Sequence, residues 1–158
     1  MIPIQNIYYM LSYAFQVLNE QGYKSVATEH FENVADLCAA ILIKGLSKQL
    51  KRGLMKDYIP KREPLTALRG KMEISETLKT NSIIKRQVVC SYDEFSENAY
   101  MNRIIKTTML RLMVADVDKS RKKEMKKLLV FLGNVEPLPI YSINWNLRYD
   151  RNNQTYRM

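Results

Sequence analysis

The chain has 158 residues, 46% of them hydrophobic, which is enough for one well-buried domain. Its formal net charge of +9 predicts an acidic partner, most often nucleic acid. One histidine and two cysteines exclude the common Cys/His zinc sites and a disulfide framework, and without a long apolar run the sequence is expected to be cytoplasmic, with no membrane partner.

The first two predicted elements are helices, which form a helical pair over residues 1–53. Pro3 suits a first helical turn, and apolar residues recur at helical spacing from Ile4 to Leu18. A second apolar stripe follows at the same spacing and is expected to end at Gly53.

Residues 54–95 are predicted to form a small β subdomain. Its first part contains Pro60 and Pro64 and is interpreted as extended or looped. Apolar and charged residues alternate over Leu68–Ile74, as in a half-buried strand, and alternation returns over Val88–Tyr92. A two- or three-stranded sheet is the resulting prediction.

Residues 96–133 are predicted to form a second helical pair, and residues 134–158 an extended C-terminal segment. The apolar residues of Met101–Met113 follow the i, i+3, i+4, i+7 pattern without a break. Ser96 and Ser120 are expected to cap the two helices. The predicted fold class is therefore α+β and mainly helical, with about four main helices and the small sheet between the helix pairs.

No catalytic constellation stands out. A nucleophile-and-base pair needs a histidine or equivalent, and His30 lies at an expected helix start, where a capping or surface role is favoured. The Lys44–Gln49 stretch lies within a helical pattern and lacks the spacing of a P-loop. This segment is therefore expected to bind no nucleotide or other cofactor itself.

Asp93 and Glu94 are the best acidic pair. Because they are adjacent, on a continuing strand they would point to opposite faces, and no Asp-x-Lys or Glu-x-Lys follows on a strand. A metal site is therefore disfavoured against turn or helix capping and against partner contact.

Asn102 is expected on a polar helix face beside Arg103. Asparagine is unfavourable inside a helix, so this one needs a reason. Its side chain either bonds a neighbouring loop or joins Arg103 in holding an interface loop.

Basic residues are concentrated from Lys44 to Lys71 and from Lys119 to Lys127. The second cluster is interpreted either as a solubilising helix face or as a surface that contacts phosphate or a partner. The candidate nucleic-acid-binding residues are Lys48, Lys51, Arg52, Lys56, Lys61 and Arg62.

Four sequence blocks occur in an order that matches one known family. They are Ile2–Ala14, Lys51–Leu54, Leu68–Ile74 and Tyr92–Thr107, and together they extend the match over nearly the whole chain. The first and fourth blocks are long enough to be fairly specific, whereas Arg-Gly-Lys alone is weak. The blocks resemble the McrC family, which supplies the nuclease subunit of McrBC modification-dependent restriction systems.

In that family the N-terminal part docks into a ring of the AAA+ GTPase subunit McrB and stimulates GTP hydrolysis. A C-terminal PD-(D/E)xK domain then cuts DNA that carries modified cytosine. The resemblance implies an McrB-like ring as partner, with GTP and Mg²⁺ as its cofactors and Mg²⁺ for the nuclease domain. This sequence ends before such a domain, so the segment is expected not to be catalytic itself. The polar positions that match the family, and are candidates for partner binding, are Arg69, Lys71, Asp93, Asn102 and Arg103.

Three hypotheses remain open. The chain is the docking and GTPase-activating part of an McrC-like subunit, a stand-alone DNA-binding module, or a complete small nuclease. The second predicts a DNA affinity that falls steeply with salt. The third predicts Mg²⁺-dependent cutting that requires Asp93, and the missing lysine motif argues against it.

Overall fold

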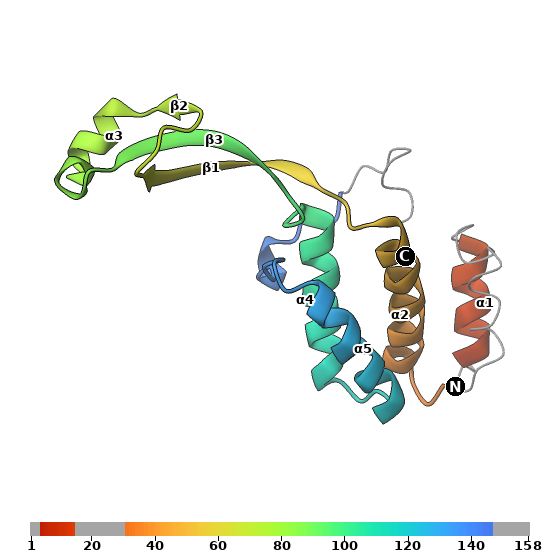
Figure 1. Ribbon diagram of the computed structural model, residues 1–158. Coiled ribbons are helices and arrows are strands. Elements are labelled where there is room, and N and C mark those ends of the chain that lie inside the picture. Colours follow the sequence, from red (N-terminus) through yellow and green to blue (C-terminus); the bar gives the residue numbers. More distant parts are fainter. Residues whose placement is uncertain (1–3, 15–30, 147–158) are drawn as a thin grey trace. The chain divides into compact units, whose positions relative to one another are not determined.

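The computed structural model describes residues 4–14 and 31–146, which belong to two compact units. The helical unit comprises Met1–Met55 and Tyr100–Met158, and the β unit comprises Lys56–Ala99. Five α-helices and a three-stranded antiparallel sheet lie in the described residues, so the predicted α+β class is confirmed (Figure 1).

In the part of the chain that the structure describes, the helical unit contains four α-helices and one 3-10 turn. Its elements are α1 (Ile4–Ala14), α2 (Val34–Arg52), α4 (Tyr100–Val114), α5 (Lys119–Phe131) and η4 (Ile140–Ser142). The first predicted helix is thus confirmed as far as Ala14, and its expected continuation to Leu18 lies outside the described residues, as does His30.

The core of the helical unit lies between α2, α4 and α5. The predicted stripe of α4 supplies Met101, Ile105 and Met109, all buried. A second cluster joins Tyr8 of α1 to the buried face of α2. Truncating one such core side chain to alanine lowers the free energy of unfolding by about 2–5 kcal/mol. These contacts therefore hold the helices of the unit in place. The buried apolar residues of the main core are Ala39, Leu42, Leu46, Met101, Ile105, Met109, Val117, Met125, Leu132 and Val135.

The helix ends agree with the sequence in part. Gly53 ends α2 as predicted, with a φ of 93° that favours glycine. In contrast, α4 begins at Tyr100, and Ser96 instead accepts a hydrogen bond from the Asn98 N–H in the preceding turn. The N-cap of α5 is Asp118, which accepts hydrogen bonds from both the backbone and the side chain of Ser120.

The β unit has strand order β1-β3-β2, with α3 and a 3-10 turn between β2 and β3. Its elements are β1 (Asp57–Leu65), β2 (Lys71–Met72), α3 (Ile74–Lys79), η3 (Ser82–Lys85) and β3 (Val88–Ser96). The strand predicted over Leu68–Ile74 shrinks to two residues because Gly70 turns the chain with a φ of 66° and α3 starts at Ile74. The proline-containing segment, predicted to be extended or looped, forms a nine-residue strand.

The outer edge of β1 carries both prolines. Val89 of β3 directs its C=O to the Glu73 N–H and its N–H to Thr77 Oγ1, away from β1. Pro64, opposite Val89, therefore occupies a non-hydrogen-bonded pair with its nitrogen facing outward, and Pro60 has the same orientation four residues earlier. Proline is tolerated here because no partner strand needs its N–H.

Candidate functional site

The β1–β3 ribbon places its side chains on two faces, as its register dictates. Pairs such as Asp57↔Ser96, Lys61↔Tyr92 and Glu63↔Cys90 share one face. Tyr58↔Phe95, Pro60↔Asp93 and Arg62↔Ser91 share the other. The predicted site residues of the β unit are divided between these faces.

Four of the candidate nucleic-acid or partner-binding cations are engaged in ion pairs inside the β unit. Their side chains are roughly half exposed or more, so each pair is worth little by itself. Their common effect is to offset much of the positive charge in the β-unit part of the basic stretch, where three glutamates face four cations. The pairs are Lys56–Glu97 at 3.4 Å, Lys61–Glu94 at 2.5 Å, Arg62–Glu73 at 3.4 Å and Lys71–Glu73 at 3.5 Å.

Two of these carboxylates are held in their charged form. A hydrogen bond from Ser91, helped by Lys71 and Arg62, lowers the pKa of Glu73. The hydrogen bond with Lys61 lowers the pKa of Glu94 and raises that of Lys61. Both carboxylates therefore remain acceptors below the pH at which a free glutamate protonates.

The remaining candidate cations of the basic stretch lie on α2. Lys51 and Arg52 are exposed in its last turn, where positive charge also interacts favourably with the helix dipole. Lys48 is half-buried one turn earlier. These three residues belong to the helical unit, whereas Lys56, Lys61 and Arg62 belong to the β unit.

Arg69 and Gly70 pack on β3. The guanidinium of Arg69 lies over the ring of Tyr92, 4.1 Å from its centroid, on the ribbon face of Lys61. The hydroxyl of Tyr92 donates to Glu63 at 2.5 Å, and this bond raises the pKa of Tyr92. A Cβ at Gly70 would collide with the Ser91 carbonyl oxygen and the Tyr92 Cβ, so only glycine fits.

Asp93 and Glu94 both lie on β3 and therefore point to opposite faces, as the sequence predicted for a continuing strand. Within the residues that the structure describes, no group of three or more His, Cys, Asp or Glu side chains is arranged to hold a metal ion. Asp93 is exposed on the face of Tyr58 and Phe95, whereas Glu94 is occupied by Lys61.

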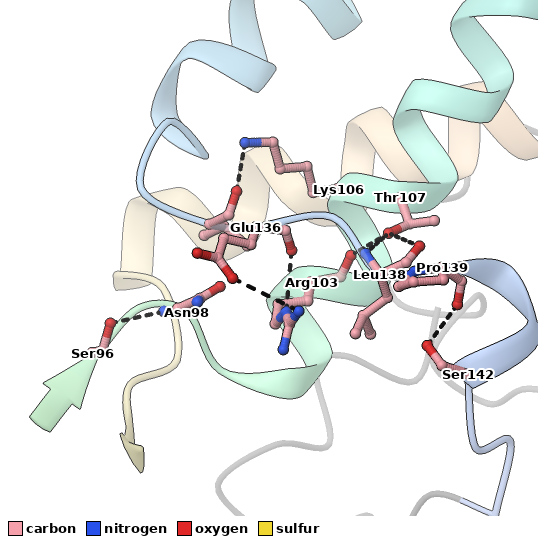
Figure 2. A network of polar contacts seen from close by, with 10 residues as sticks. Ser96, Asn98, Arg103, Lys106, Thr107, Glu136, Leu138, Pro139 and Ser142 are labelled. Atoms are coloured by element: carbon pink, nitrogen blue, oxygen red, sulfur yellow. Dashed lines mark hydrogen bonds and ion pairs between the residues drawn. The ribbon is translucent and has the colours of Figure 1, made fainter. Parts of the chain in front are cut away.

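Asn102 and Arg103 belong to the helical unit and support its own loops. Asn102 is fully buried and its Nδ2 donates to the Met55 carbonyl oxygen at 2.8 Å, which is the neighbouring-loop bond that the sequence left open. Arg103 Nε donates to the Glu136 carbonyl oxygen at 3.2 Å (Figure 2). In this conformation the Asn102 side chain has no surface to offer a partner.

Lys106 and Thr107 complete a network on the same side of α4, which Figure 2 shows. Lys106 Nζ donates to the carbonyl oxygens of Leu132 and Val135, at 2.9 and 2.5 Å. Thr107 Oγ1 accepts from the Leu138 N–H at 2.7 Å. Consecutive residues of α4 thus hold the end of α5 and the segment that follows it.

Sequence reasoning missed the exposed apolar surface of the β unit. Leu68, Met72 and Ile74 were assigned to a half-buried strand, yet they lie 69%, 43% and 64% exposed. Hydrophobic alternation gave no signal of this, because it is the same for a covered face and an uncovered one. The large apolar side chains exposed in this stretch, named here the apolar tip, are Leu68, Met72, Ile74, Leu78, Ile83 and Ile84.

The turn that carries Ile83 and Ile84 is held in an unusual backbone conformation. Asn81 and Arg86 flank η3 with φ values of 52° and 56°. Left-handed backbone is uncommon for arginine and costs of the order of 1 kcal/mol, and such strain concentrates at functional sites. The Gln87 N–H donates to the Ser82 carbonyl oxygen at 3.0 Å and closes the turn, so the two isoleucines are presented by a fixed backbone.

Comparisons with known proteins identify relatives of this chain. A sequence profile of the family described as McrBC 5-methylcytosine restriction system component matches residues 4–158. The type IV methyl-directed restriction enzyme EcoKMcrBC of Escherichia coli (strain K12) is 33% identical over 112 residues, which are 71% of this chain and 32% of that protein.

Two solved structures from Thermococcus gammatolerans share the fold. In the cryo-EM structure of the McrBC complex, the matching chain has a TM-score of 0.65 at 18% identity, over 98% of this chain and 48% of that one. In a half-complex from a tetradecameric assembly of McrB AAA+ hexamers with bound McrC, the matching chain has a TM-score of 0.61 at 16% identity. The match covers 91% of this chain and 37% of that one. The present chain thus spans about a third of the curated relative and less than half of each solved chain.

Proposed function

This chain belongs to the family of McrBC 5-methylcytosine restriction system components, and on that premise we propose that it is the partner-docking part of an McrC-like subunit. It binds an AAA+ GTPase ring and stimulates GTP hydrolysis within a restriction endonuclease specific for modified cytosine. GTP and Mg²⁺ act at the ring, and Mg²⁺ serves a nuclease domain that lies outside this segment. The half-complex of hexamers with bound McrC supports a ring as the kind of partner.

The apolar tip is the observation that carries the docking proposal. Burying a large apolar side chain is favourable relative to leaving it in water. A partner that covers one such side chain fully therefore gains about 1.5–3 kcal/mol of binding free energy from it. Ile84 is 82% exposed and Leu68 69% exposed within one short stretch of the β unit. Concentrated apolar exposure of this kind marks a protein-binding surface.

The charges of the β unit favour a protein partner over DNA. Lysine and arginine side chains that neutralise phosphates release the counter-ions condensed on the DNA, and this release drives much of the binding. Lys56, Lys61 and Arg62 already face glutamates, whose negative charge would oppose an approaching phosphate. The proposal therefore assigns DNA contact to the complex rather than to this unit.

The test is the GTP hydrolysis rate of the AAA+ subunit of the same restriction system, measured with and without the chain. We expect stimulation by the unaltered chain and a loss of at least about tenfold in apparent affinity for Ile84→Ser. Val114→Ser is the matched control, because Val114 is 87% exposed but lies in the helical unit. A folded chain that neither binds nor stimulates the ring would refute the proposal.

A further inference from the structure

We propose that Tyr58, Asp93 and Phe95 form an acceptor for an arginine side chain of the partner protein. The inference rests on the proposed function, because it names the chemistry by which the β unit would recognise its partner. The three side chains share one face of the β1–β3 ribbon, on adjacent cross-strand pairs.

The geometry of the ribbon brings these three groups within reach of one guanidinium. Tyr58 and Phe95 are directly opposite each other, and their ring centroids lie 5.0 Å apart. Asp93 is two residues before Phe95, so its side chain leaves the same face about 7 Å along the strand. A guanidinium stacked on a ring and bonded to the carboxylate spans such a distance.

The rings are open to solvent. Tyr58 is 68% exposed and Phe95 58% exposed, although each has the size and apolar character of a core residue. Their mutual contact covers only part of each ring, so an aromatic surface stays available for a further stacking group. Arginine is the side chain best suited to stack on it, because its planar cation is weakly hydrated.

The charge of Asp93 selects the occupant. Among the carboxylates of β1 and β3 in the described structure, Glu63 and Glu94 bond Tyr92 and Lys61, and Asp57 accepts its neighbour's N–H, whereas Asp93 has no such bond. The cations nearest in sequence register on its face, Arg62 and Lys71, both pair with Glu73. An exposed carboxylate beside two rings attracts a cation and repels the phosphates of a nucleic acid.

The opposite face of the same ribbon shows how this recognition works. There Arg69 lies over the ring of Tyr92 at 4.1 Å, with Glu63 bonded to the Tyr92 hydroxyl. An arginine, an aromatic ring and a carboxylate are thus combined within one chain on that face. On the face of Asp93 the ring and the carboxylate are present, and we assign the arginine to the partner.

The experiment measures binding of the whole chain to the AAA+ GTPase ring of its own system, by calorimetry at low and moderate salt. Asp93→Asn is expected to weaken binding by about tenfold, Asp93→Lys by about a hundredfold, and Phe95→Leu by an intermediate factor. Asp93→Glu keeps the charge and should retain most of the affinity. Asp116→Asn removes an equal charge from an exposed position in the helical unit and should leave binding unchanged.

The outcomes separate this inference from the proposed function. Wild-type binding with unchanged affinity for Asp93→Asn and Asp93→Lys would overturn the arginine acceptor and leave ring docking intact. A folded wild-type chain that does not bind the ring would overturn both. Weakened binding together with a smaller salt dependence in Asp93→Asn supports the acceptor, because a merely structural role for Asp93 would not change the salt dependence.

Discussion

Arg121 of α5 and Asp36 of α2 form a buried ion pair, with 2.6 Å between Nη1 and Oδ2. The other oxygen of Asp36 accepts the Asp118 N–H at 3.0 Å, so one carboxylate joins the first turns of two helices. The guanidinium also lies 4.9 Å from the ring centroid of Phe31. The amino-terminal ends of α2 and α5 are therefore fixed to each other by polar contacts at the margin of the core.

Removal of the Asp36 carboxylate is expected to destabilise the helical unit strongly. Asp36→Ala leaves a largely buried guanidinium without its counter-charge, which costs about 3–5 kcal/mol. Unfolding in urea, followed by circular dichroism, measures the loss. Lys123→Ala, on the exposed side of α5, should change stability by no more than about 0.5 kcal/mol. A loss below about 1 kcal/mol for Asp36→Ala would show that the pair contributes little.

Lys106 is expected to stabilise the end of α5. Lys106→Met keeps most of the aliphatic side chain but removes the donor to two carbonyl oxygens, Leu132 and Val135. We expect a loss of about 1–3 kcal/mol, because those acceptors then lose their charged partner. Faster amide exchange in the last turn of α5 should accompany it, and Lys126→Met is the control on an exposed position of the same helix. Unchanged exchange would contradict this role.

Gly70→Ala should destabilise the β unit. The left-handed backbone costs about 1–2 kcal/mol with a Cβ, and the collision with β3 adds to that cost. Gly133→Ala is a milder change, because its added Cβ meets only the Val130 carbonyl oxygen at 3.3 Å. Thermal unfolding of both variants checks the order of the two losses. Equal losses would mean that β3 moves to accommodate the methyl group.

The β unit should lose stability at both extremes of pH. Folding lowers the pKa values of Glu73 and Glu94. Their contribution to the free energy of unfolding is therefore complete above the ordinary pKa of 4.5, and it is lost as the pH falls through the lower pKa values of the folded state. The pKa of Lys61 is raised, so its contribution is complete below 10.5 and is lost as pH rises through the folded value. Unfolding of Glu94→Gln against pH should show a weaker acid dependence than the wild type. An identical acid limb would exclude the Lys61–Glu94 pair as a cause.

The isolated chain should bind duplex DNA weakly. Since Lys56, Lys61 and Arg62 face glutamates, the β unit offers phosphates little net positive charge, which leaves contact mainly to cations of the helical unit such as Lys51 and Arg52. We expect log–log slopes of affinity against salt of about −3 or shallower, measured by fluorescence anisotropy. A slope of about −6 or steeper would revive the interpretation of the chain as a DNA-binding module.

The elements with strong periodicity were predictable from sequence. The stripe of α4 follows helical spacing over four turns, and its residues Met101, Ile105 and Met109 are buried as expected. Gly53 marked the end of α2 because its backbone angle suits glycine alone. In these cases the local pattern and the tertiary packing favour the same structure.

Long-range partners could not be predicted in the same way. Arg121 was grouped with the basic cluster of residues 119–127. Its ion-pair partner Asp36 is 85 residues away in sequence, so the residues next to Arg121 in the sequence do not indicate the pair. The sequence did not distinguish a strand from a loop at β1, because proline is unfavourable in most strand positions. Both prolines are tolerated there because pairing with β3 turns their nitrogens outward. The candidate site residues were likewise chosen by residue type, whereas their exposure and pairing are set by the register of the ribbon.

The prolines of β1 also govern how copies of this chain behave toward one another. A free strand edge ordinarily recruits a further strand, and that addition is a route to domain swapping and amyloid. Pro60 and Pro64 remove two of the donors that an incoming strand would need, at alternate outward positions four residues apart. The residues of the apolar tip can therefore stay exposed while this strand edge resists polymerisation.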